Sequence, residues 1–215
     1  MKKVALILGV VILAIALPYS PMLIENLTAQ TGSAKEGFKE GDIIFHTSQS
    51  KQSPLIQFAT RSKLSHCGII VMREGRPYVL EASKSLVLTP LEEFIARGKD
   101  GKYWVKRYCK ESINLKYASY LGKPYDAAFK PNNGIYYCSE LVYDIYIKQL
   151  GIKLCEPKQV KDYLILGTNR LQKIKSTMDR RGITMDQYVV APVDIYNSRY
   201  LKRVKGGSSI VAEGR

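Results

Sequence analysis

Tyr136-Tyr137-Cys138-Ser139-Glu140, continued to Leu150, is the stretch that decides the fold of this sequence. Its apolar side chains keep the three-to-four spacing of a buried helical stripe, and they are Leu141, Val142, Ile145 and Leu150. Gly151 follows as a typical helix stop. We therefore predict a helix over residues 138–150 that starts directly after a loop and buries one face.

Around this helix the sequence predicts a small sheet. Apolar and β-branched runs indicate strands at Ile43–Phe45, Cys67–Met72, Tyr78–Glu81 and Trp104–Tyr108, with a late strand at Gln187–Val193. Weaker patterns indicate helices at Asn114–Tyr120 and Asp162–Lys175. The order of strands, helix and strand predicts an α+β domain with a mainly antiparallel sheet.

Cys138 is the candidate nucleophile because it stands where loop changes to helix. The unpaired amides and the positive end of the helix dipole at such a position favour a thiolate. The same amides, including that of Cys138, could face a developing oxyanion. The alternative is a buried cysteine that packs as a small apolar residue.

A base for Cys138 must come from two histidines, His46 and His66. If Glu74-Gly75 is a two-residue turn, the numbers of facing residues sum to 149, which places His66 and Glu81 on one face as diagonal neighbours. A carboxylate there can fix the imidazole tautomer. Alternatively, Glu81 is a solvated strand end, and for His46 we expect a structural role.

The charge and the N-terminus indicate the surroundings. With 33 basic and 19 acidic residues, the net charge of +14 favours anionic neighbours, but no motif for nucleic acid accompanies it and no metal site or cofactor is indicated. Lys2 and Lys3 precede an apolar run from Val4 to Leu17. That run would reach about 21 Å as a helix, short of the roughly 30 Å of a bilayer core.

We therefore expect residues 1–29 to be a signal peptide or an uncleaved membrane anchor, with the remainder exported to the periplasm or cell envelope. A linker over 30–40, a catalytic domain over 41–205 and a flexible tail over 206–215 complete the predicted organisation. Disulfide pairing among Cys67, Cys109 and Cys155 stays open, as do the oligomeric state and the role of the basic region 158–181.

Four motifs together resemble the YiiX-like branch of the NlpC-type papain-like cysteine hydrolases, a circularly permuted group. They occur in the right order at Leu64–Ile69, Pro77–Ala82, Tyr120–Asp126 and Tyr137–Val142. The resemblance covers about residues 41 to 155 and implies a papain-like sheet or partial barrel against which the cysteine helix packs. It implies Cys138 as nucleophile, His66 as base, Glu81 as the third member and Tyr125 as a substrate contact.

The resemblance implies hydrolysis of an amide or isopeptide bond through an acyl-enzyme, in cell-wall peptides. A second hypothesis keeps the enzyme but gives it a lipid-derived amide or ester at a membrane surface. A third is a noncatalytic module that binds wall peptides, with a structural Cys138. Cys67, directly after the histidine, departs from the family pattern and could pair, bind a metal or pack.

Overall fold

The computed structural model describes residues 37–108, 113–164 and 169–204. The predicted leader 1–29, most of the linker 30–40, the tail 206–215 and Cys109 lie outside these ranges. None of the helices within them is long and apolar enough to cross a membrane.

Six antiparallel strands form the main sheet, in the order β4-β3-β2-β1-β5-β8. Their bounds are β1 Ile43–Ser48, β2 His66–Arg73, β3 Arg76–Ala82, β4 Leu86–Pro90, β5 Gly98–Tyr108 and β8 Leu201–Arg203. A separate two-stranded sheet pairs β6 Lys158–Gln159 with β7 Tyr188–Val189. The helices are α2 Ser53–Thr60, α3 Leu91–Ala96, α4 Cys138–Leu150, α5 Val160–Tyr163, α6 Asn169–Arg181 and α7 Pro192–Tyr196. The α+β prediction is confirmed.

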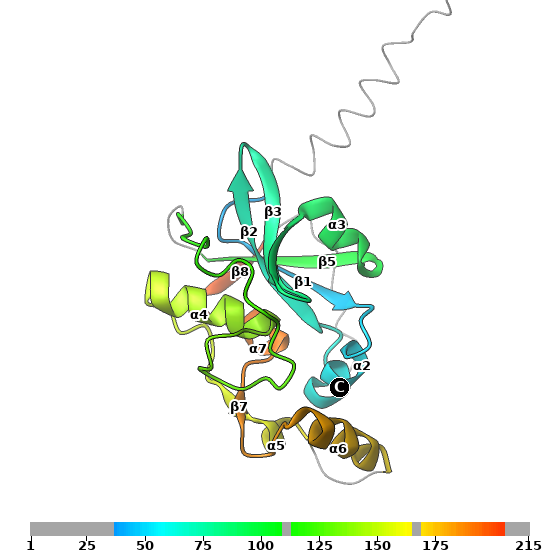
Figure 1. Ribbon diagram of the computed structural model, residues 1–215. Coiled ribbons are helices and arrows are strands. Elements are labelled where there is room, and N and C mark those ends of the chain that lie inside the picture. The colour runs from blue at the N-terminus through cyan, green and yellow to red at the C-terminus, as the bar shows by residue number, and fades with distance from the viewer. Residues whose placement is uncertain (1–36, 109–112, 165–168, 205–215) are drawn as a thin grey trace, which may run out of the picture. The chain divides into compact units, whose positions relative to one another are not determined.

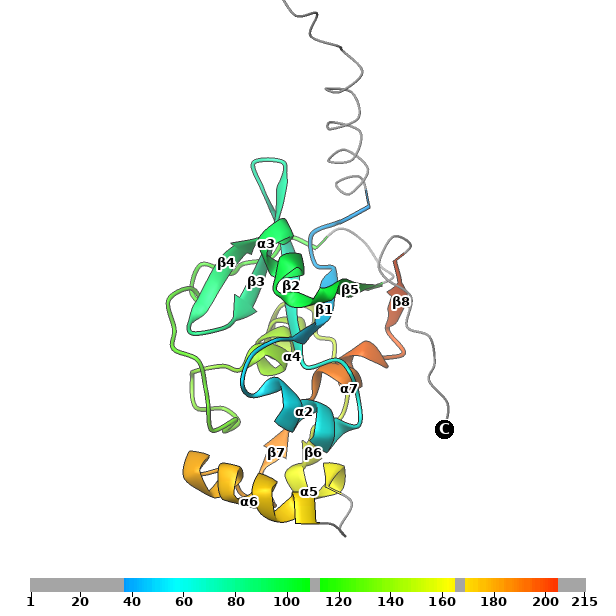
Figure 2. The ribbon, with the colours of Figure 1, turned by 90° about the vertical axis from the view of Figure 1, so that its right-hand side faces the viewer.

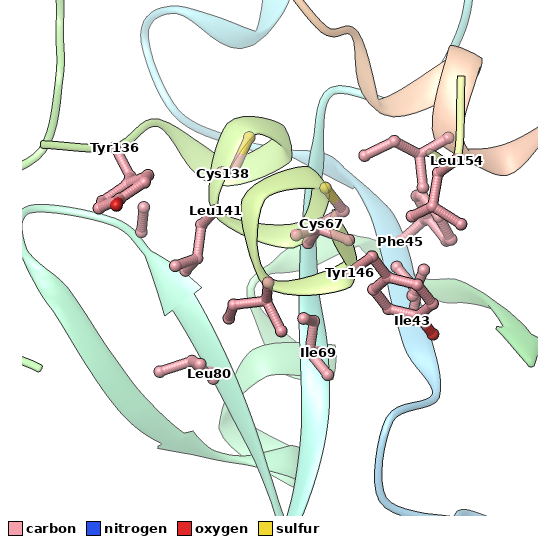
Figure 3. Packing of buried hydrophobic residues seen from close by; sticks show 14 of the residues in the cluster. Ile43, Phe45, Cys67, Ile69, Leu80, Tyr136, Cys138, Leu141, Tyr146 and Leu154 are labelled. Carbon is pink, nitrogen blue, oxygen red and sulfur yellow. The ribbon is translucent and has the colours of Figure 1, made fainter. Parts of the chain in front are cut away.

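Helices cover both faces of the sheet (Figures 1 and 2). On one face, α4 packs its buried Leu141, Ile145 and Tyr146 against strand residues such as Ile69 (Figure 3). On the other, Phe94 of α3 joins a cluster with Ile44, Ile70, Val79 and Val105. Since side chains alternate along a strand, the continuous burial of β1 and β2 follows from this two-sided cover.

The predicted helix over 138–150 is confirmed residue for residue. Gly151 ends it in the left-handed region, at φ 66°, and donates to the carbonyls of Ile147 and Tyr146. The hydroxyl of Tyr146 donates to the Gly41 carbonyl at 2.7 Å, which ties the far end of α4 to the start of β1.

Other local predictions were wrong. Residues 114–120 form no helix, because the Glu40 carboxylate binds the Leu115 amide and Gln149 binds both backbone groups of Lys116. The predicted helix over 162–175 is instead α5 followed, beyond the undescribed residues 165–168, by α6. The strand predicted over 187–193 shortens to β7, because Pro192 starts α7.

Candidate active site

The nucleophile candidate Cys138 is the first residue of α4 and is nearly buried, with 3% of its surface exposed. Tyr137 before it is extended, and the first intrahelical bond runs from the Leu141 amide to the Tyr137 carbonyl. The amides of residues 138–140 therefore have no acceptor within the helix. This arrangement suits an oxyanion site that includes the Cys138 amide, the role predicted from the sequence.

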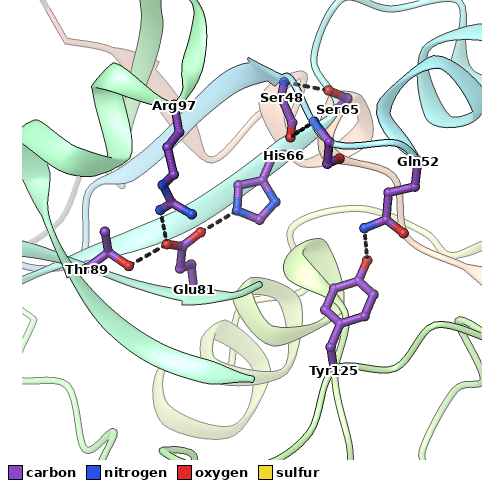
Figure 4. Close-up of polar contacts among 9 residues, drawn as sticks. Ser48, Gln52, Ser65, His66, Glu81, Thr89, Arg97 and Tyr125 are labelled. Carbon is purple, nitrogen blue, oxygen red and sulfur yellow. Dashed lines mark hydrogen bonds and ion pairs between the residues drawn. The ribbon is translucent and has the colours of Figure 1, made fainter. Parts of the chain in front are cut away.

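The base candidate His66 opens β2, and its hairpin has the predicted register. Ile69 pairs with Leu80 and Arg73 with Arg76, so facing numbers sum to 149 around the Glu74-Gly75 turn. Nε2 of His66 lies 2.6 Å from Oε2 of Glu81 (Figure 4). The structure thus brings His66 and Glu81 together as the predicted hairpin register required. It leaves Nδ1 of His66 for other partners.

Gly68 makes this hairpin possible next to the histidine. A Cβ at this position would lie 2.4 Å from Cγ1 of Val79 and 2.7 Å from the Leu80 carbonyl oxygen. Because real side chains do not approach so closely, only glycine lets β3 come this near to β2 here. The close approach keeps Glu81 within reach of the imidazole.

Glu81 is fully buried, and both oxygens of its carboxylate have hydrogen-bond partners. Thr89 of β4 donates to Oε1 at 2.5 Å, and the Arg97 guanidinium after α3 donates to the same oxygen (Figure 4). Burial alone would raise the pKa of Glu81, but the bonds from His66, Thr89 and Arg97 outweigh it and lower the pKa to about 2. The alternative, that Glu81 is a solvated strand end, is therefore excluded.

The thiol and the imidazole shift each other toward the charged forms. Burial opposes a charged His66, but Cys138 and then Glu81 outweigh burial and raise the pKa of His66 to about 10. A bond from the Cys67 thiol, with the charge of His66, holds the pKa of Cys138 well below its usual range despite burial. The pair therefore rests as thiolate and imidazolium near neutral pH.

Cys67 is a buried free thiol that packs in the core beside α4 (Figure 3). Cys138 and Cys155 are also free, so no disulfide joins the three described cysteines. Burial, followed by the influence of Cys138, raises the pKa of Cys67 well above its usual range. Cys67 consequently stays a neutral donor next to a thiolate.

The remaining predicted residues lie close by. The Tyr125 hydroxyl accepts a hydrogen bond from Gln52 at 2.9 Å, and burial followed by Cys138 raises the Tyr125 pKa well above its usual range. His46 is buried and stacks on Phe94 at 4.4 Å. Burial and then the charge of His66 lower the His46 pKa to about 3, so this ring is neutral at physiological pH.

Sequence reasoning missed Thr89 and Arg97. Both lie in elements that were not predicted, or at their ends: Thr89 is in β4 and Arg97 directly follows α3. No local motif marks either residue, since each acts through a carboxylate on a neighbouring strand. Glu81 pairs with Val87 of β4, and Thr89, two residues further on, points to the same face, but this pairing appears only in the structure.

Two cavities open beside the catalytic candidates. The first has a volume of about 90 Å³ and is almost wholly apolar. It is lined by Cys138 and reaches between α2, α5 and α6 past Ile56, Ala59 and Met178. The second, called the polar cavity because most of its lining residues are polar, has a volume of about 630 Å³ and is lined by His66, Lys84 and Arg97 among others. Of these two cavities, the first is lined by Cys138 and not by His66, and the second by His66 and not by Cys138.

An antiparallel sheet, a cysteine at a helix start and a histidine held by a carboxylate define a papain-like thiol hydrolase. The chain belongs to the family of permuted papain-like amidases, YaeF/YiiX, C92 family, whose family model matches residues 37–205. The family is one of cysteine hydrolases, so the chain is an enzyme of this type.

Individual relatives agree with the family match. The chain is 35% identical over 171 residues to the uncharacterized protein YiiX of Escherichia coli K12, covering 76% of this chain and 84% of that protein. A crystal structure of YiiX from Escherichia coli O157:H7, described as a metalloprotein, has a TM-score of 0.69 and 35% identity, and covers 78% of this chain and 97% of that one. In the described part of this chain, no three His, Cys, Asp or Glu side chains group as a metal site.

Proposed function

We propose that Cys138, His66 and Glu81 hydrolyse an amide or ester whose acyl group is aliphatic. The Cys138 thiolate attacks the carbonyl carbon, the carbonyl oxygen takes the negative charge, and the bond to the leaving group breaks as the His66 imidazolium gives it a proton. Water then attacks the thioester, His66 accepts its proton, and the carboxylic acid leaves with Cys138 restored as the thiolate.

The apolar cavity beside Cys138 is the observation that carries the aliphatic substrate. Cys138 lines this cavity, so an acyl group bonded to its sulfur can enter a space that is walled by leucine, isoleucine, valine and methionine side chains with almost no polar surface. Such a wall offers no partner for a peptide backbone, whose unpaired polar groups are costly to bury. It therefore supports the lipid-derived substrate over the cell-wall peptide.

Alkylation tests the nucleophile. Below pH 7, iodoacetamide should label Cys138 at least about tenfold faster than Cys67 or Cys155, because the other two thiols have raised pKa values. In His66→Ala this advantage should be lost. Labelling of the three thiols at equal rates would exclude Cys138 as the nucleophile.

Mass spectrometry of products tests the substrate class. Wild type and Cys138→Ala are incubated with membrane lipid extract and with soluble cell-wall peptides. We expect new free fatty acid only with lipid and only with wild type. Cleavage of wall peptides alone would overturn the aliphatic substrate and leave the thiol mechanism in place.

A further inference from the structure

The two cavities divide the substrate at the bond that is cleaved. In acyl transfer to a thiolate, the imidazolium protonates the leaving group, so the leaving group must lie on the imidazole side of the sulfur. Nε2 of His66 is committed to Glu81, which leaves Nδ1 for that proton transfer. The polar cavity is lined by His66 and not by Cys138, and it is therefore the leaving-group side.

The charges of this cavity have one sign. Lys84 and Arg97 line it together with serine and glutamine side chains, and no carboxylate is among its lining residues. Its volume of about 630 Å³ lies within the range of roughly 300–1,000 Å³ that small-molecule sites occupy. A polar space with two cationic side chains and an imidazolium favours an anion.

Lys84 and Arg97 both keep side-chain N–H groups that no described acceptor binds. Arg97 binds Glu81 through one terminal nitrogen, while its Nε is buried without a partner in the described residues. Lys84 is exposed, makes no ion pair with any described carboxylate, and lies in the β3–β4 turn that the Ser85–Pro124 bridge fixes. The Arg97 side chain as a whole is 41% exposed, so the guanidinium that binds Glu81 can also bind an anionic oxygen from the cavity.

We propose that the leaving group of the substrate carries an anionic group, a carboxylate or a phosphate, which Lys84 and Arg97 bind in the polar cavity. The substrate is then an amphiphile with an aliphatic acyl chain on the Cys138 side and an anion on the His66 side. This inference rests on the proposed acyl hydrolase, and it names the part of the substrate that the apolar cavity leaves unspecified.

Binding to the inactive Cys138→Ser variant tests the inference without turnover. Calorimetry compares N-decanoylglycine with N-decanoylglycinamide, which differ only in a carboxylate and a neutral amide. A second pair, N-decanoyl-phosphoethanolamine and N-decanoylethanolamine, shows whether phosphate or carboxylate is preferred. We expect at least one anionic ligand to bind roughly tenfold more tightly than its neutral partner, as for a hydrogen bond to a charged group.

The Lys84→Gln substitution, added to Cys138→Ser, should reduce that preference severalfold. Lys202→Gln removes the same charge from an exposed lysine on β8, at the opposite edge of the sheet, and should leave the preference unchanged. Arg97 is left intact because it also holds Glu81. Equal affinity within both pairs overturns the anionic leaving group alone, and a preference that Lys84→Gln leaves unchanged overturns the role of Lys84. Failure of all four ligands to bind overturns the aliphatic substrate as well.

Discussion

At the scale of single residues, the site is built around one ionised carboxylate. Glu81 receives bonds from His66, Thr89 and Arg97, which come from β2, β4 and the residue after α3. Its lowered pKa means that it keeps its charge throughout the physiological range. The His66 imidazolium is stabilised by this charge from one side and by the Cys138 thiolate from the other.

The pH dependence of the reaction follows from these shifts. The ion pair exists above the lowered pKa of Cys138 and is lost as the pH rises through the raised pKa of His66, about 10. We expect kcat/KM to stay level through neutral pH and to fall above about pH 10. In Glu81→Gln the alkaline limb should move to lower pH, and the rate should fall by roughly 10²-fold or more. A variant with an unchanged profile would show that Glu81 does not act through His66.

Cys67 influences the pKa of Cys138, the proposed nucleophile. Its bond is the largest of the influences that lower the Cys138 pKa, so Cys67→Ala should raise that pKa and slow the alkylation of Cys138 at pH 6. Cys155→Ala is the matched control, because Cys155 is a second free thiol that does not appear among the causes of the Cys138 shift. If both substitutions leave the rate unchanged, Cys67 serves only to pack the core.

At the scale of elements, α4 must hold its first residue against the end of the sheet. The buried bond from Tyr146 to the Gly41 carbonyl fixes the opposite half of the helix. We expect Tyr146→Phe to lower the free energy of unfolding by about 1 kcal/mol, since it leaves a buried carbonyl without its partner. Urea unfolding measures the change. Tyr143→Phe, on the same helix but with a half-buried ring, should change it by less than about 0.5 kcal/mol.

Elements could be predicted from the sequence where their interactions are local. The α4 stripe and the β2–β3 register are local patterns, so the sequence was enough to bring His66 and Glu81 together. The helix predicted over 114–120 does not form, because its backbone is bonded by Glu40 and Gln149, which are far away in the chain. Likewise, Thr89 and Arg97 reach Glu81 only through the pairing of strands and the packing of α3, which no short pattern encodes.

At the scale of the molecule, the basic segment that the sequence left without a role forms one wall of the apolar cavity. Residues of α5 and α6 face those of α2 across it, and Leu164, Met178 and Ile183 form a small core of their own there. The polar surface of α6 explains why the cavity was not predicted. The few apolar residues of α6 form a cavity wall only because they face α2.

The apolar cavity predicts that the enzyme distinguishes substrates by the length of their acyl chains. Ala59→Leu adds three carbons to the lining of the cavity and should lower kcat/KM for decanoyl substrates by about tenfold, while butanoyl substrates change less than about twofold. Ala127→Leu, at an exposed alanine outside the cavity, is the control and should change neither. An equal loss for both chain lengths would place the acyl group elsewhere.

The three donors around Glu81 keep the site ordered before a substrate binds. With both carboxylate oxygens occupied, neither the acid nor the ring bonded to it is free to rotate. An incoming molecule therefore meets a proposed base, His66, that is already oriented, and little of its binding energy is spent on ordering side chains before reaction.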